Sequence, residues 1–195
     1  MARTQAADYA EKRKAITKAA AHLFAKHGFA QASVSKIATA CDISKSVIFH
    51  YHPSKEDILF AVMEAHMMDL LTTINPALYE DIEANKRFEA FSKKLLKRYA
   101  GAADSQKVLL YELDNLPAPQ HKEIVKEQRL LIDFASELLR QAIHPNNPDQ
   151  KRLRVQIMLF FGMINWMHTW YKPGPGLSRE QLALYAADTT IRALV

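Results

Sequence analysis

The sequence predicts an all-α protein built from nine helices in two successive blocks. Only five glycines occur in 195 residues, while alanine, leucine, lysine and glutamate, which favour helices, are found throughout. Hydrophobic side chains recur three and four positions apart, and no stretch alternates apolar and polar residues as a half-buried strand does. Serine, aspartate and glycine stand where helices are expected to begin or end. We therefore expect helices joined by short turns and no β-sheet.

Three helices are expected in the first part of the chain. The first begins at Asp8, whose side chain can cap it, and runs to about His27. Gly28 follows, at a point where a residue in the left-handed conformation ends a helix at low cost. Ser33 and Ser44 are placed to cap two further short helices that a three-residue turn separates.

A longer helix is expected to begin at Ser54, with acidic residues in its first turn, and to end before Pro76. Five more helices follow, separated by loops of which residues 144–148 and 172–176 are the richest in proline. We place the domain boundary at the start of the long helix, which gives domains of residues 1–53 and 54–195. The last five helices are predicted over residues 86–102, 104–116, 119–143, 150–171 and 178–195.

The composition is that of an ordinary globular protein of the cytoplasm. Cys41 is the single cysteine, so neither a disulfide framework within the chain nor a cysteine-based zinc site is expected. The N-terminus lacks the apolar run of a signal peptide. The most apolar stretch, residues 155–171, is interrupted by Gln156, Asn165 and His168, which favours a buried helix over a membrane span.

Positive charge is concentrated in the first third of the chain. Residues 1–60 contain nine Lys and Arg against five Asp and Glu, whereas residues 61–195 contain 17 against 16. Such an excess is expected of a module that binds phosphates, although a basic surface without a polyanionic partner has the same composition.

Residues 28–56 have the pattern of a helix-turn-helix, whose second helix can enter the major groove of DNA. Ile43 and Ile48 are expected to face inward, which leaves the outer side of that helix to bases, and nearby hydroxyls and lysines to phosphates. Val47 has no donor and can contact only a thymine methyl group or a sugar. The expected DNA-contacting residues are Ser33, Ser35, Lys36, Ser44, Lys45, Ser46, Val47, Phe49, His50, Tyr51 and Lys55.

This segment resembles the TetR family of transcriptional repressors. The likeness covers about residues 10–60 and rests on Gly28-Phe29, on a serine-rich second helix containing Ile37-Ala38, on the recognition helix, and on Ser54-Lys55-Glu56 after it. Family members more often have Gly, Thr and Tyr where this sequence has Ser46, Val47 and Phe49. The resemblance implies a homodimer that binds a palindromic operator and is released by a small effector.

The last two predicted helices carry many apolar and small side chains. Residues 150–171 are apolar on most faces, so that helix must be covered on several sides. Small residues in 178–195 permit another helix to approach closely. The family resemblance implies a four-helix bundle formed by two helices of each subunit, and packing within one chain is the alternative. The candidate interface residues are Phe161, Ala183, Ala187 and Thr190.

Residues 162–178 resemble a narrower group of the family, the acyl-CoA-responsive, PaaR-like repressors that sense phenylacetyl-CoA, and so do Ser46 and residues 50–53. A CoA thioester requires an apolar slot and cations for its phosphates. Each residue that suits this purpose also suits the core or the surface. The candidate effector contacts are Met63, His66, Met67, Phe91, Lys94, Arg98, Tyr111, Arg129, Phe160, Met163 and Trp166.

Enzyme motifs are missing from the sequence. It lacks the His-Glu-x-x-His spacing of zinc hydrolases, a glycine-rich phosphate loop and a Gly-x-Ser-x-Gly elbow. We therefore predict no enzyme activity, no metal and no cofactor. Two alternatives remain: a helical adaptor that binds proteins, and a repressor of the same family that senses a hydrophobic, drug-like compound.

Overall fold

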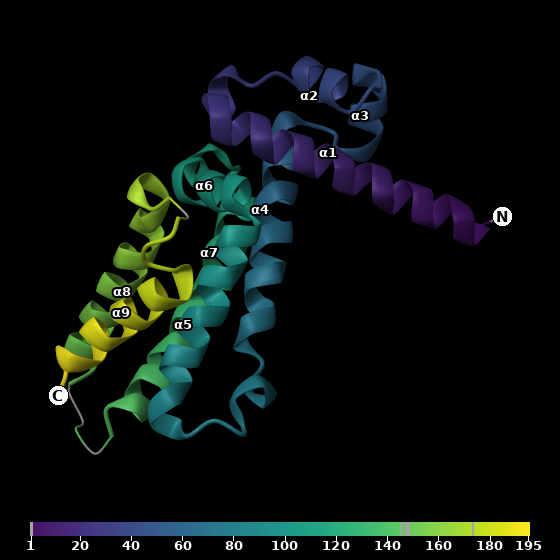
Figure 1. Cartoon of the computed structure of the whole chain (residues 1–195). Coiled ribbons are helices and arrows are strands. Elements are labelled where there is room, and N and C mark those ends of the chain that lie inside the picture. The colour runs from purple at the N-terminus through teal and green to yellow at the C-terminus, as the bar shows by residue number, and fades with distance from the viewer. Residues whose placement is uncertain (1, 145, 147–148, 173) are drawn as a thin grey trace. The chain divides into compact units, whose positions relative to one another are not determined.

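The computed structural model describes residues 2–144, 146, 149–172 and 174–195, and side chains from Asp8 onward. These residues form α-helices and short 3-10 turns and no β-strand, which confirms the predicted all-α fold (Figure 1). Pro145, Asn147, Pro148 and Pro173 of the predicted loops lie outside the described residues. The α-helices are α1 (Ala2–Gln31), α2 (Val34–Ala40), α3 (Lys45–Tyr51), α4 (Lys55–Leu71), α5 (Ala84–Gly101), α6 (Ala103–Tyr111), α7 (Ala118–Ala142), α8 (Gln150–Trp170) and α9 (Arg179–Arg192).

Helix ends follow the predicted capping residues closely. The hydroxyl oxygens of Ser33, Ser44 and Ser54 accept hydrogen bonds from backbone N–H groups in the first turns of α2, α3 and α4, which confirms all three caps. Gly28 has φ +77° and ψ 158°, a conformation that residues with a side chain rarely adopt, and it interrupts α1 where the sequence predicts.

Three helix boundaries differ from the prediction. α1 begins at Ala2 rather than near Asp8, and no proline or glycine precedes Asp8 to stop it. α4 ends at Leu71, where the hydroxyls of Thr72 and Thr73 each bond to a carbonyl three residues back. Short 3-10 turns then follow, η1 (Thr72–Ile74) and η2 (Pro76–Tyr79), and η3 (Leu113–Asn115) follows α6 in the same way.

The chain forms two compact units. The first unit contains residues up to His66 together with 104–124, and the second unit contains residues 67–103 and 125–195. α6 and the start of α7 therefore pack with the N-terminal helices, which the sequence did not indicate. α4 and α7 contribute residues to both units. The functional division into residues 1–53 and 54–195 stays a prediction.

The core of the first unit joins α1 to α2, α3 and α4. Ile16, Ile37, Ile48 and Ile58, one from each helix, are fully buried. Figure 1 shows α2 and α3 next to each other beside α1. α2 and α3, with seven residues each, are too short to be stable alone and depend on this packing.

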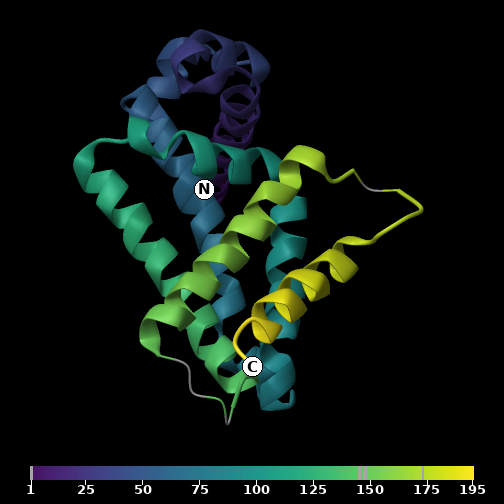
Figure 2. The same ribbon diagram turned by 90° about the vertical axis from the view of Figure 1, so that its left-hand side faces the viewer.

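The core of the second unit contains an aromatic cluster. Phe88 lies with its ring centre 4.8 Å from that of Phe160 and 6.5 Å from that of Phe91, and Phe91 in turn contacts Phe134 at 5.9 Å. α9 packs closely on α5 and also contacts α8 (Figure 2). This packing uses the small residues of α9, whose side chains are buried within the chain.

Candidate nucleic-acid interface

The turn between α2 and α3 is tightly fixed. Asp42 has φ +54°, a left-handed conformation that aspartate tolerates better than most residues. The backbone N–H of Ile43 donates to the carbonyl of Ala38 at 3.1 Å, and the thiol of Cys41 lies 3.8 Å from the carbonyl oxygen of Ala15 in α1. The two short helices are thereby held in one arrangement, as a helix-turn-helix requires.

α3 has one buried side chain, Ile48, and exposes the other residues from Lys45 to His50. The last residue of the helix, Tyr51, is half-buried and packs against Tyr9 of α1, with ring centres 4.6 Å apart and the rings tilted by 37°. Because only Ile48 faces the core, the helix presents a continuous outer face. That exposed face consists of Lys45, Ser46, Val47, Phe49 and His50.

The predicted phosphate-binding residues fall into two groups. Ser33, Ser35, Lys36 and Ser44 are exposed at the starts of α2 and α3. Lys55 is half-buried and already engaged: its ammonium lies 4.2 Å from the ring centre of Phe29 and donates to the carbonyl of Ala30 at 3.3 Å. Lys55 therefore links the start of α4 to the end of α1.

Further polar contacts tie α6 and α7 to the rest of the first unit. His22 lies 3.0 Å from Asp104 at the start of α6. His66 and Gln106, both buried, form a hydrogen bond of 2.6 Å between α4 and α6. Gln120 of α7 donates to Asp57 at 2.8 Å. Such contacts join segments far apart in the sequence, and no local pattern could have indicated them.

Two family models match the chain. Residues 16–62 match the bacterial regulatory proteins of the tetR family, and residues 81–194 match the tetracyclin repressor-like C-terminal domain. The chain belongs to the TetR family of transcriptional regulators.

Known structures agree with this assignment. A TetR-family regulator from Bordetella parapertussis is 36% identical, with a TM-score of 0.84 over 91% of this chain and 93% of that one. AibR, solved in complex with isovaleryl coenzyme A and operator DNA, is 27% identical, with a TM-score of 0.78 over 91% of this chain and 97% of that one. The Bordetella relative is named as a TetR-family transcriptional regulator, in agreement with the family models.

The curated relatives match over a shorter stretch. The uncharacterized HTH-type transcriptional regulator YerO of Bacillus subtilis is 28% identical over 117 residues, which are 58% of this chain and 39% of that relative. The chain therefore spans well under half the length of that relative. Among the described residues, no helix is both long enough and apolar enough to cross a membrane.

The candidate effector contacts are divided between the two units. In the first unit, Met63 and His66 are buried, whereas Tyr111 is exposed. In the second unit, Phe91 and Phe160 belong to the aromatic cluster. The remaining second-unit candidates are Met67, which is buried, Lys94 and Met163, which are half-buried, and Arg98, Arg129 and Trp166, which are exposed.

Two of the three candidate cations already have protein partners. The ammonium of Lys94 lies 5.9 Å from the ring centre of Tyr79, and Arg98 pairs with Asp69 at 2.8 Å. Arg129 is exposed on α7. A ligand phosphate would therefore compete with Asp69 for Arg98, whereas Arg129 can be reached from solvent.

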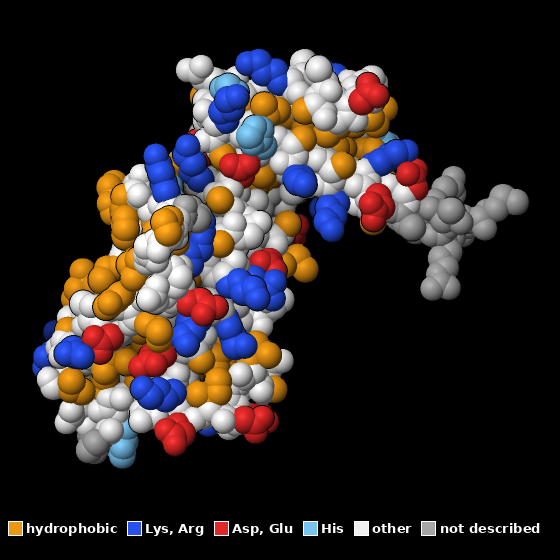
Figure 3. Space-filling model, viewed as in Figure 1, with side chains coloured by type: hydrophobic (Ala, Val, Ile, Leu, Met, Phe, Trp, Pro, Cys, Tyr) orange, Lys and Arg blue, Asp and Glu red, His pale blue; other side chains and the backbone are white. Residues whose placement is uncertain are grey.

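The candidate dimer residues are buried within the chain itself. Phe161, Ala183, Ala187 and Thr190 are at most 7% exposed, so a second copy has no access to them. This corrects the choice of residues, because the small side chains of α9 serve its packing on α5. α8 instead exposes a different apolar stripe on its opposite side, which Figure 3 shows as orange side chains along this helix. The stripe consists of Val155, Leu159, Gly162, Trp166 and Trp170.

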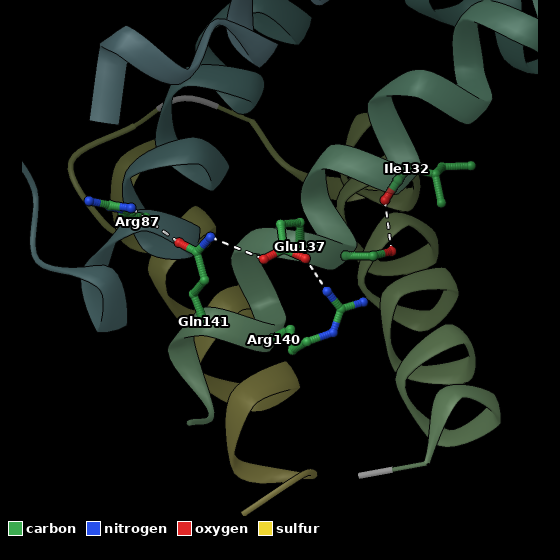
Figure 4. Close-up of polar contacts among 6 residues, drawn as sticks. Arg87, Ile132, Glu137, Arg140 and Gln141 are labelled. Atoms are coloured by element: carbon green, nitrogen blue, oxygen red, sulfur yellow. Dashed lines mark hydrogen bonds and ion pairs between the residues drawn. The ribbon is translucent and has the colours of Figure 1, made fainter. Parts of the chain in front are cut away.

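A hollow in the second unit lies between the start of α5 and the end of α7, and its lining includes Glu137, Arg140 and Gln141. The three residues at the end of α7 have polar partners (Figure 4). Arg140 pairs with Glu137, and Gln141 accepts from Arg87 at 3.3 Å and donates to Glu137 at 3.2 Å. None of the candidate effector residues lines this hollow, so we assign no ligand to it.

His52 is a buried residue that the sequence analysis did not single out. It follows α3, is 2% exposed, and its Nε2 atom has no hydrogen-bond partner among the described residues. Burial lowers the pKa of His52, the charge of Arg13 lowers it further, and Asp57 opposes them. The sequence offered one indication of this burial. His52 directly precedes Pro53, where the chain passes from α3 to α4.

The lowered pKa of His52 predicts that acid destabilises the protein. Below the ordinary histidine pKa of about 6.5, the unfolded chain binds a proton that the folded chain excludes, so stability falls as pH decreases. We expect His52→Phe to remove that part of the pH dependence, measured by urea unfolding at fixed protein concentration. His50→Phe, at an exposed position of α3, is the control and should keep it. Equal pH dependence in wild type and His52→Phe would contradict the assignment.

Proposed function

We propose that the protein is a dimeric repressor that binds a palindromic operator through α2 and α3 and releases it when a small effector binds. The observation that carries the proposal is the packing of α3. This helix buries Ile48 against the core and leaves its outer face exposed. Membership of the TetR family supports it. The basic N-terminal third of the chain supplies the charge that DNA binding requires.

The DNA-contacting residues divide by role. Lys45, Ser46, Val47, Phe49 and His50 on α3 are proposed to face the bases, with Tyr51 at their edge. Ser33, Ser35, Lys36 and Ser44 are proposed to contact phosphates. We infer that Lys55 acts mainly by position, since its ammonium is held by Phe29 and Ala30.

Lys36 and Lys55 should therefore respond differently to replacement by alanine. Lys36→Ala removes one phosphate contact from each protomer, so it should weaken binding to all duplexes and reduce the slope of log K against log salt by about 1.8 for the dimer. Lys55→Ala should lower stability by roughly 1 kcal/mol through loss of the cation–π contact, and leave the slope unchanged. Fluorescence anisotropy with an operator selected from random duplexes measures both slopes. The same slope change in both variants would refute the division of roles.

The dimer is proposed to form through the exposed stripe of α8, together with Tyr185 of α9, which is 62% exposed. Val155, Leu159, Gly162 and Trp166 are four, three and four residues apart, the spacing by which one side of a helix meets another helix. This side is opposite the buried residues of α8, which suits a helix covered by its own chain on one side and by a second copy on the other.

A charge in this stripe should dissociate the dimer. Leu159→Glu is expected to give monomers in sedimentation experiments and to weaken operator binding strongly, because the two half-sites no longer reinforce each other. Leu130→Glu, which changes a similarly exposed leucine on α7, is the matched control and should remain dimeric. A dimeric Leu159→Glu variant would place the interface elsewhere.

We propose an acyl-CoA thioester as the effector, with phenylacetyl-CoA as the first choice. The sequence likeness to acyl-CoA-responsive repressors supports this, and the similarity to AibR is compatible with it. α4 offers a route to the DNA, since Met63 and His66 lie in its first-unit part and Met67 in its second-unit part. A ligand that binds the state released from DNA more tightly than the DNA-binding state shifts the protein toward the released state. The size of the shift is set by the ratio of the two affinities.

Arg129 provides a test that leaves the core intact. Isovaleryl-CoA and phenylacetyl-CoA should release the operator, and free CoA should release it far less. Arg129→Ala should require about tenfold more acyl-CoA, because it loses one charge-assisted contact to phosphate, while its operator affinity without ligand stays the same. Lys126→Ala, also exposed on α7, is the control. Release by hydrophobic drug-like compounds, with no response to acyl-CoA, would favour the alternative effector class.

A further inference from the structure

The outer face of α3 carries two exposed apolar side chains. Val47 is 37% exposed and Phe49 is 40% exposed, on either side of the fully buried Ile48. The other large exposed hydrophobic residues described in the first unit are Tyr9 and Tyr111, which have hydroxyl groups. Val47 and Phe49 thus stand out as side chains that offer no hydrogen bond at the surface proposed to face DNA.

The helical repeat places Val47 and Phe49 on opposite flanks of this face. Successive residues are rotated by about 100°, so Ser46 and His50 point away from Ile48 and the two apolar residues lie to either side of them. Val47 shares its flank with Tyr51, which is turned toward Tyr9 of α1. Phe49 shares its flank with Lys45.

The surroundings distinguish the two apolar residues. The ammonium of Lys45 lies 5.6 Å from the ring centre of Phe49, so a cation covers that ring. The hydroxyl of Ser46 is hydrogen-bonded to that of Ser44 at 2.8 Å, at the start of the helix. The methyl groups of Val47 are exposed beside these polar groups, and they provide an apolar contact point on their flank of α3.

The major groove presents one apolar group with sequence information, the C5 methyl of thymine. We propose that Val47 packs against a thymine methyl group in each operator half-site and sets the base preference at that position. The inference rests on the proposed DNA-binding function and deepens it. A contact between Val47 and deoxyribose would be equally apolar but independent of sequence, so the two are separable by experiment.

Removing the methyl group from the DNA tests the inference without altering the protein. An operator is first selected from random duplexes with the wild-type protein, and its thymines are replaced one at a time by deoxyuridine, which pairs identically but lacks the C5 methyl. Loss of one buried methyl should weaken binding about fourfold, and loss at both symmetric positions about fifteenfold.

Two variants assign the effect to Val47. Val47→Ala should bind the thymine operator more weakly and no longer distinguish thymine from uracil at that position. Leu130→Ala, which shortens an exposed apolar side chain of α7 outside the proposed DNA-binding surface, is the control and should retain the full distinction. Both positions are exposed, so the fold tolerates these changes.

The outcomes separate the inference from the proposed function. Equal binding of thymine and uracil operators at every position would overturn the inference while operator binding stands. The same result follows if Val47→Ala still distinguishes the two bases. If the random pool yields no enriched sequence and binding depends on salt alone, the proposed operator-specific function fails, and the inference fails with it.

Discussion

Ile48 is the side chain on which the proposed DNA-binding surface depends. α3 contains seven residues, far fewer than a helix needs to be stable in water, and Ile48 is the one that is buried. The Ser44 cap fixes one end of the helix, and the packing of Tyr51 against Tyr9 fixes the other. The burial of Ile48 and the contacts at the two ends therefore set the orientation of α3, and with it the direction in which each exposed side chain of the helix points.

The elements could be predicted because their signals are local. A serine that caps a helix bonds to a backbone N–H three residues away, so Ser33, Ser44 and Ser54 could be identified from the sequence alone. The same holds for Gly28, whose positive φ is a property of one residue. The helix-turn-helix follows from these positions and from the buried isoleucines between them.

Contacts that span the sequence could not be predicted in this way. α6 joins the first unit through His22 and through the His66–Gln106 pair, which bring together residues 82 and 40 positions apart. The dimer residues were misplaced for a related reason. A helix that is apolar on most sides, such as α8, does not indicate which side its own chain covers, and the alanines of α9 suit close packing on α5 as well as on a second copy.

The exposed stripe of α8 has a practical consequence for the study of assembly. The chain has two tryptophans, and both stand on this helix, with Trp166 61% exposed and Trp170 54% exposed. The three helices of the DNA-binding region contain none. The intrinsic tryptophan fluorescence therefore reports on the burial of this side of α8. Changes in α1, α2 or α3 add no tryptophan emission of their own.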